Sequence, residues 1–103
     1  MSDKRDQPPA KKEMQLQIQL DEDIAQGIYA NLTMVNHTET EFALDFIYLQ
    51  PQQPRAKVRT RIISSPKHTK RLLMALKDNI EKYEKKFGNI DISGPSPEDE
   101  ALH

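Results

Sequence analysis

The sequence predicts an α+β fold, in which a four-stranded antiparallel sheet (a meander) packs under one C-terminal amphipathic helix. Four short segments before residue 65 alternate apolar and polar residues, which is the pattern of half-buried strands. One long segment after residue 65 repeats apolar residues every three or four positions, which is the pattern of a helix. Strands followed by a helix are typical of the α+β class.

The 103 residues fit a single domain, which we expect to span residues 13–92. Residues 1–12 are charged and contain prolines, and residues 93–103 are acidic, so both ends are predicted to be disordered tails. No apolar stretch is long enough for a signal peptide or a membrane span, so we expect a cytoplasmic protein with no membrane partner. The absence of cysteine excludes disulfides and thiolate zinc sites.

The first predicted strand has the clearest alternation. It places three glutamines on one side and four apolar residues on the other, namely Met14, Leu16, Ile18 and Leu20. The acidic run from Asp21 to Asp23 ends this strand. We therefore expect one edge of the sheet to begin here.

The second and third predicted strands, residues 28–36 and 41–49, form a hairpin around a loop at residues 36–40. Pairing Met34 with Phe42 places Leu32 opposite Leu44 and brings the apolar residues of both strands onto one face. That face is predicted to be the core face beneath the helix. The third strand contributes Phe42, Leu44, Phe46 and Tyr48 to it.

The fourth predicted strand, residues 56–64, follows a loop that contains two prolines. Ser65 and Pro66 then start the helix, because serine caps the free N–H groups and proline is tolerated at the first helical position. The helix carries an apolar stripe formed by Leu72, Leu73, Leu76, Ile80, Tyr83 and Phe87. Gly88 is placed to end the helix in a left-handed conformation.

The second face of the predicted sheet keeps several apolar residues, which would form a large exposed patch. An exposed apolar patch commonly marks an interface, so we expect a homodimer. The predicted oligomer face consists of Tyr29, Val35, Ile47, Leu49 and Ile63, with Ala43 among them.

Charged residues are segregated along the chain, although the net charge is only −1. Residues 13–49 contain acids and no Lys or Arg, whereas residues 55–71 contain bases and no acid. Strand alternation places the first three members of the candidate partner-binding site in one row, with the other three nearby at the helix start. The site consists of Lys57, Arg59, Arg61, Lys67, Lys70 and Arg71. Two alternatives are internal pairing of Asp45 with Arg59 or Arg61, and protection of an edge strand by its cations.

No pattern of catalytic residues is recognisable. The three glycines are isolated, and the acids fall in predicted turns or on outer faces. His37 lies near Glu39 and Glu41, but their spacing matches no metal-ligand pattern, and a polar turn is the favoured interpretation. We therefore predict a protein that is not an enzyme and has no cofactor or metal site.

Five short motifs give the chain a family resemblance. In order, they are Gly27–Asn31, Val35–Thr38, Glu41–Phe46, Arg61–Pro66 and Tyr83–Gly88. Over residues 15–90 the sequence resembles a bacterial family of small proteins classed as domain of unknown function 3467. The family has no established activity or catalytic residues, so the resemblance implies a small stand-alone bacterial protein and nothing about mechanism.

These observations predict a non-enzymatic binding or scaffold module that works as a homodimer and presents Lys57, Arg59 and Arg61 to an acidic partner. The alternative is a nucleic-acid-associated protein that binds phosphates through the same basic row. No stacking aromatic residue is interleaved with that row, which disfavours single-strand binding. A third interpretation is a chaperone-like protein that binds peptides through the apolar face.

Overall fold

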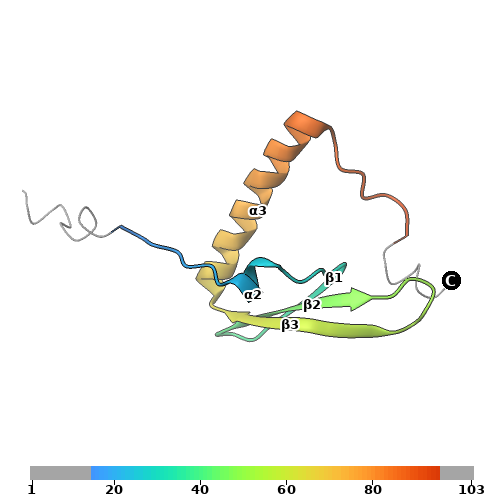
Figure 1. Ribbon diagram of the computed structural model, residues 1–103, viewed down its shortest axis with the longest axis horizontal. Helices are drawn as coiled ribbons and strands as arrows, with labels where there is room; N and C mark the ends of the chain where they lie inside the picture. Colours follow the sequence, from blue (N-terminus) through green and yellow to red (C-terminus); the bar gives the residue numbers. More distant parts are fainter. Residues whose placement is uncertain (1–14, 96–103) are drawn as a thin grey trace, which may run out of the picture.

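The computed structural model describes residues 15–95. The predicted N-terminal tail, Met14, and residues 96–103 of the predicted C-terminal tail lie outside this range. The elements are α2 (Glu22–Ala25), β1 (Leu32–His37), β2 (Phe42–Leu49), β3 (Ala56–Ser64) and α3 (Pro66–Phe87). The strands form one antiparallel sheet in the order β1-β2-β3, and α3 rises away from the end of β3 (Figure 1). The predicted α+β class is confirmed, but the sheet has three strands and not four.

The first predicted strand is the one that the sheet lacks. Residues 15–20, which we call the N-terminal arm, run as an extended segment without a strand beside them (Figure 1). Leu16, Ile18 and Leu20 are 86%, 83% and 66% exposed. A β-strand requires a hydrogen-bonded neighbour. Within residues 15–95 the arm has none, so alternation alone did not make it a strand.

The pairing of β1 with β2 differs from the predicted register. His37 lies opposite Phe42, where Met34 was predicted, so the register is shifted by three residues. The hairpin closes in a tight turn, in which the Thr38 N–H donates to the Glu41 carbonyl (2.9 Å) and Thr38 Oγ1 accepts from the Glu41 N–H (3.2 Å). Because this turn is shorter than the predicted loop, β1 continues to His37. An odd shift also exchanges the two faces of β1 relative to β2.

Beyond the start of β1, the side chain of Asn31 continues the pairing in place of the backbone. Its Nδ2 donates to the Leu49 carbonyl and its Oδ1 accepts from the Leu49 N–H, each at 2.9 Å. The Asn31 N–H also donates to the Ile47 carbonyl (3.0 Å). Since the amide takes the role of a backbone partner, β1 starts at Leu32 and not at the predicted residue 28.

A β-bulge interrupts the pairing of β2 with β3. Phe46 lies opposite Thr60, whereas the next residue, Ile47, lies opposite Val58, which leaves Arg59 without a partner. Residues that lie opposite each other share a face of the sheet. After the bulge, the side chains of β3 therefore alternate in the opposite phase relative to β2.

The two faces of the sheet are buried to different extents. On the outer face, Asp45, Ile47 and Leu49 are only 7%, 4% and 6% exposed. On the opposite face, which we call the helix face, Phe42, Leu44, Phe46 and Tyr48 are half-buried. The predicted core face is therefore wrong among the described residues. Leu32 and Val58 flank Ile47 on both sides, whereas α3 leaves the helix face largely uncovered (Figure 1).

The predicted helix signals are confirmed in α3. Ser65 Oγ accepts from the His68 N–H (3.1 Å), and Pro66 is the first helical residue. The helix ends at Gly88, which has a φ of 98° and donates its N–H to the Glu84 carbonyl (2.9 Å). With 22 residues, α3 is about 33 Å long, longer than the eight residues of β2 at about 27 Å. Much of its apolar stripe is consequently exposed.

Candidate binding groove

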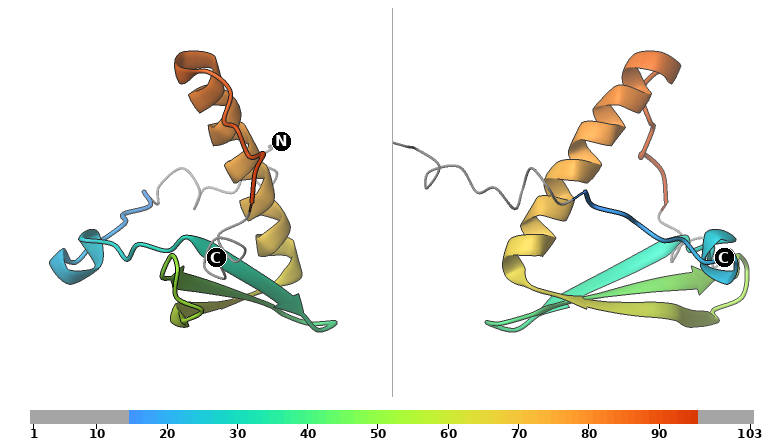
Figure 2. Two further views of the ribbon diagram at one scale, coloured as in Figure 1. Left: turned by 90° about the vertical axis from the view of Figure 1, so that its right-hand side faces the viewer. Right: turned by 60° about the vertical axis from the view of Figure 1, so that its left-hand side comes forward.

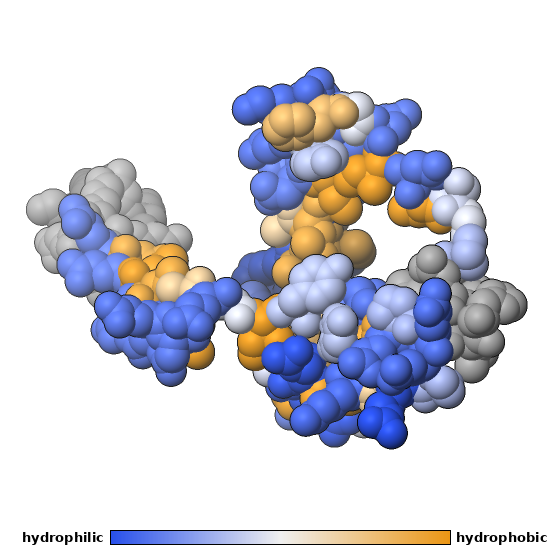
Figure 3. All heavy atoms as spheres, turned by 45° about the vertical axis from the view of Figure 1, so that its right-hand side comes forward, coloured by the Kyte–Doolittle hydropathy of each residue, from blue (hydrophilic) through white to orange (hydrophobic). Residues whose placement is uncertain are grey.

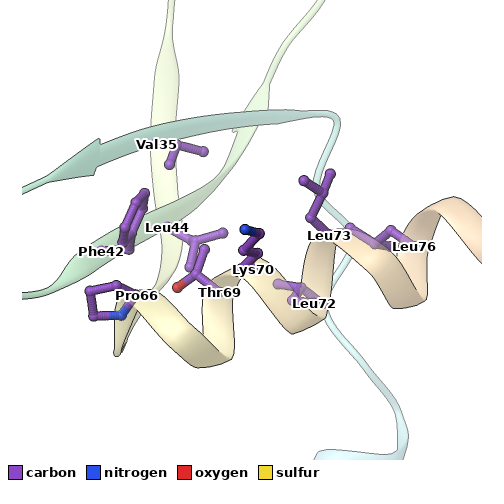
Figure 4. Close-up of a pocket in the computed structure, with 9 residues that line it drawn as sticks. All are labelled: Val35, Phe42, Leu44, Pro66, Thr69, Lys70, Leu72, Leu73 and Leu76. Carbon is purple, nitrogen blue, oxygen red and sulfur yellow. The ribbon is translucent and has the colours of Figure 1, made fainter.

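The first half of α3 and the helix face of the sheet enclose an apolar groove of about 630 Å³ (Figure 4). β1 contributes Val35, and β2 contributes Phe42 and Leu44. The helix contributes Pro66, Thr69, Lys70, Leu72, Leu73 and Leu76. The side chains from the sheet and the helix point toward one another in the close-up (Figure 4).

Local pairing explains why these side chains meet. Val35 and Leu44 are direct cross-strand partners, and Phe42 lies opposite Ser64, the last residue of β3. The chain turns at Ser65, so Pro66 starts α3 directly beside Phe42 (Figure 4). The helix then rises from the sheet, and the space between them is the groove. Leu73 is 61% exposed although it lines this groove.

Three cations stand at the start of α3. Lys67, Lys70 and Arg71 are three and four residues apart, so they are neighbours on the helix surface. Ion pairs among residues 15–95 join only Arg61 to Asp45 and Lys82 to Asp78, so these three cations have no carboxylate within 4.0 Å there. The groove is thus apolar inside and cationic at one end.

The predicted basic row on β3 is wrong as a single row. The bulge separates Lys57, which lies opposite Tyr48 on the helix face, from Arg61, which lies opposite Asp45 on the outer face. Arg61 is held by two bonds to Asp45, from Nε to Oδ1 (2.6 Å) and from Nη2 to Oδ2 (2.9 Å). The alternative of internal pairing is therefore confirmed for Arg61. These hydrogen bonds lower the pKa of Asp45 from its usual 3.8, against the opposing effect of desolvation.

The predicted oligomer face is also not a single surface. Val35 lies on the helix face and lines the groove, whereas Ile47 and Leu49 are buried on the outer face. Tyr29 and Ile63 remain exposed. The cause is the shift of three residues, which moved Val35 to the other face. A substitution at Ile47 would consequently disturb the core and would not test a partner surface.

Sequence reasoning missed the groove, although one signal was available. The apolar stripe from Leu72 to Phe87 continues for about four turns, further than a small sheet can cover. We assigned the whole stripe to the core. The part of the stripe beyond Leu76 does not line the groove, and Ile80, Tyr83 and Phe87 are exposed.

The remaining candidate residues gather no further site in the part of the chain that the structure describes. The ring of His37 stacks on Phe42, with centroids 5.2 Å apart. Among residues 15–95, no three His, Cys, Asp or Glu side chains are placed to hold a metal ion. No helix in that range is long and apolar enough to cross a membrane.

The fold and the groove define a small α+β module with a three-stranded antiparallel sheet and a long amphipathic helix that is largely uncovered. The model of the family described as protein of unknown function (DUF3467) matches residues 1–92, and the chain belongs to this family. This confirms the resemblance found in the sequence. The comparisons with curated proteins and with solved structures found no match.

Proposed function

We propose that the protein is a non-enzymatic binding module, whose groove holds an extended apolar segment of a partner protein with acidic residues next to it. The observation that carries this proposal is the composition of the groove. Eight of its nine lining residues are uncharged, and the ninth, Lys70, belongs to the three cations at the start of α3. An apolar surface beside unpaired cations is complementary to a segment that is apolar and then acidic.

The shape of the groove favours a peptide over a small molecule. Its volume is within the range of ligand pockets, but such pockets usually place several polar groups around the ligand. Here only Thr69 and Lys70 supply side-chain polar groups. The groove also borders β1, an edge strand of the sheet, and edge strands can accept an extended peptide by backbone hydrogen bonds.

The acidic partner of the sequence prediction is retained, but its proposed site moves. Arg61 is engaged by Asp45, so the proposal relies on Lys67, Lys70 and Arg71. The alternative is nucleic-acid binding through Lys57, Arg59 and these helix cations. It has less support, because the bulge separates the cations of β3 and the surface beside the helix cations is apolar.

The test is fluorescence anisotropy with a synthetic peptide that alternates leucine and glutamine and ends in three aspartates. The receptor is the full chain carrying Leu16→Asp, which removes one apolar residue of the arm as a competitor. We expect binding, and we expect Leu73→Asp to weaken it by at least about tenfold, because it places a charge in the apolar groove.

Ile80→Asp is the matched control, because Ile80 lies on the same stripe outside the groove and should leave binding unchanged. Equal binding by the Leu73 variant would refute the proposal. Tight binding of duplex DNA that falls steeply with salt, and that is lost in Arg59→Glu, would favour the nucleic-acid alternative.

A further inference from the structure

The N-terminal arm is an apolar segment without a partner in the described chain. Its apolar residues share one side of an extended chain and are the most exposed aliphatic residues before β1, namely Leu16, Ile18 and Leu20. In the space-filling view, the arm and α2 stand clear of the sheet and α3 (Figure 3). The turned ribbon views agree that α2 projects beyond the sheet (Figure 2). Exposed apolar groups of this kind mark an interaction surface.

We propose that the arm of one copy occupies the groove of a second copy, so that two copies exchange arms in a symmetric homodimer. The inference rests on the proposed function and names the partner segment of the same groove. A two-fold exchange fills both grooves and covers both arms at once.

The dimensions of the arm and the groove agree. From Leu16 to Leu20 an extended chain spans about 14 Å. Along α3 the groove runs from Pro66 to Leu76, which is about 15 Å of helix. Three apolar side chains on one side of the arm can therefore lie along the full groove.

The charges also agree, and they set the direction of the arm. Asp21, Glu22 and Asp23 directly follow Leu20, and they take part in no ion pair among residues 15–95. An arm that runs opposite to α3 places these acids at the start of the helix, beside the three unpaired cations. The positive end of the helix dipole favours the same arrangement.

The backbone of the arm has a place as well. Val35 lines the groove from β1, and β1 is an edge strand with no further strand on its outer side within residues 15–95. An arm in the groove can add to this edge as a fourth strand, which is the strand that the sequence pattern predicts and the single chain lacks. Exchange between copies therefore explains why the alternating pattern exists.

The first test uses two charge-reversed full-length variants. One carries Asp21→Lys, Glu22→Lys and Asp23→Lys, and the other carries Lys67→Glu, Lys70→Glu and Arg71→Glu. In sedimentation equilibrium we expect the unchanged protein to dimerise and each variant alone to dimerise at least about tenfold more weakly. The equimolar mixture should recover the dimer, because each arm then meets a groove of opposite charge.

The control is Lys85→Glu with Lys86→Glu, which reverses two charges at the far end of α3 and should leave dimerisation unchanged. A monomeric unchanged protein would overturn the proposal. Variants that dimerise like the unchanged protein, or a mixture that does not recover the dimer, would also overturn it.

A second test depends on the absence of cysteine from the chain. Mixing the single variants Ile18→Cys and Leu73→Cys under oxidising conditions should give a disulfide-linked heterodimer. Ile18→Cys mixed with Ile80→Cys should not, because Ile80 does not line the groove. If the double variant Ile18→Cys/Leu73→Cys forms its disulfide within one chain, the arm fills its own groove and arm exchange is wrong.

The two proposals can fail separately. If the synthetic peptide binds the groove but the single-cysteine variants do not cross-link, the binding function stands and arm exchange is wrong. If the peptide does not bind and no cross-link forms, both are wrong.

Discussion

The central strand β2 and the N-terminal arm carry similar sequence patterns and have opposite fates. Both alternate large apolar residues with others, yet Ile47 in β2 is 4% exposed and Leu16 in the arm is 86% exposed. β2 has a strand on each side, whereas the arm has none within residues 15–95. Alternation thus gives a segment the capacity to form a strand, and neighbouring strands decide whether it is buried.

The largest expected effect comes from truncating the same kind of side chain in the two environments. Ile47→Ala should destabilise the fold by about 2–5 kcal/mol, because it leaves a cavity at the buried centre of the outer face. Leu73→Ala should cost less than about 0.5 kcal/mol when the groove is empty, because that side chain is mostly exposed. Urea unfolding of both variants in an Ile18→Asp background measures the difference. Equal losses would mean that the two regions are equally buried in solution.

A smaller effect is expected at the edge between the sheet and the segment before it. Asn31→Ala removes both side-chain hydrogen bonds to the Leu49 backbone and leaves those backbone groups partly buried without partners. We expect a loss of about 1–3 kcal/mol in the free energy of unfolding. Faster amide exchange at Leu49 in the variant would locate the effect there. Unchanged exchange at this amide would contradict the assigned hydrogen bond.

The smallest effect is a pH dependence from the pair of Asp45 and Arg61. The pKa of Asp45 is lowered in the folded protein, chiefly by its hydrogen bond to Arg61, so its charged form stabilises the fold above the usual carboxyl pKa of 3.8. This contribution is lost as the pH falls through the lowered value. Asp45→Asn should therefore be less stable at neutral pH, and the difference should shrink below about pH 4.

Urea midpoints measured from neutral to acidic pH check this sign. Asp78→Asn is the matched control, because Asp78 pairs with Lys82 (3.1 Å) at an exposed site on α3. That variant should change stability less at every pH. A difference for Asp45→Asn that grows as the pH falls would refute the assignment.

The sequence by itself determined the features that depend on neighbouring residues. The helix start at Ser65 and Pro66 and its end at Gly88 were predicted, because capping involves groups only a few residues apart. The strand at residues 56–64 was predicted with its observed bounds, and residues 42–49 lie within one residue of the prediction. Proline-containing or polar turns on both sides limit these strands locally.

Only the tertiary structure decided the register, the bulge and the fate of the arm. Two pairings of β1 with β2 satisfy the same alternation, and the turn at Thr38–Glu41 selects between them. The bulge at Arg59 left Asp45 facing Arg61 and moved Lys57 to the other face, which no strict alternation can show. The arm differs again, because its alternating pattern calls for a strand neighbour that no segment within residues 15–95 provides. Each of these features depends on which distant segments meet, and local residue patterns do not contain that information.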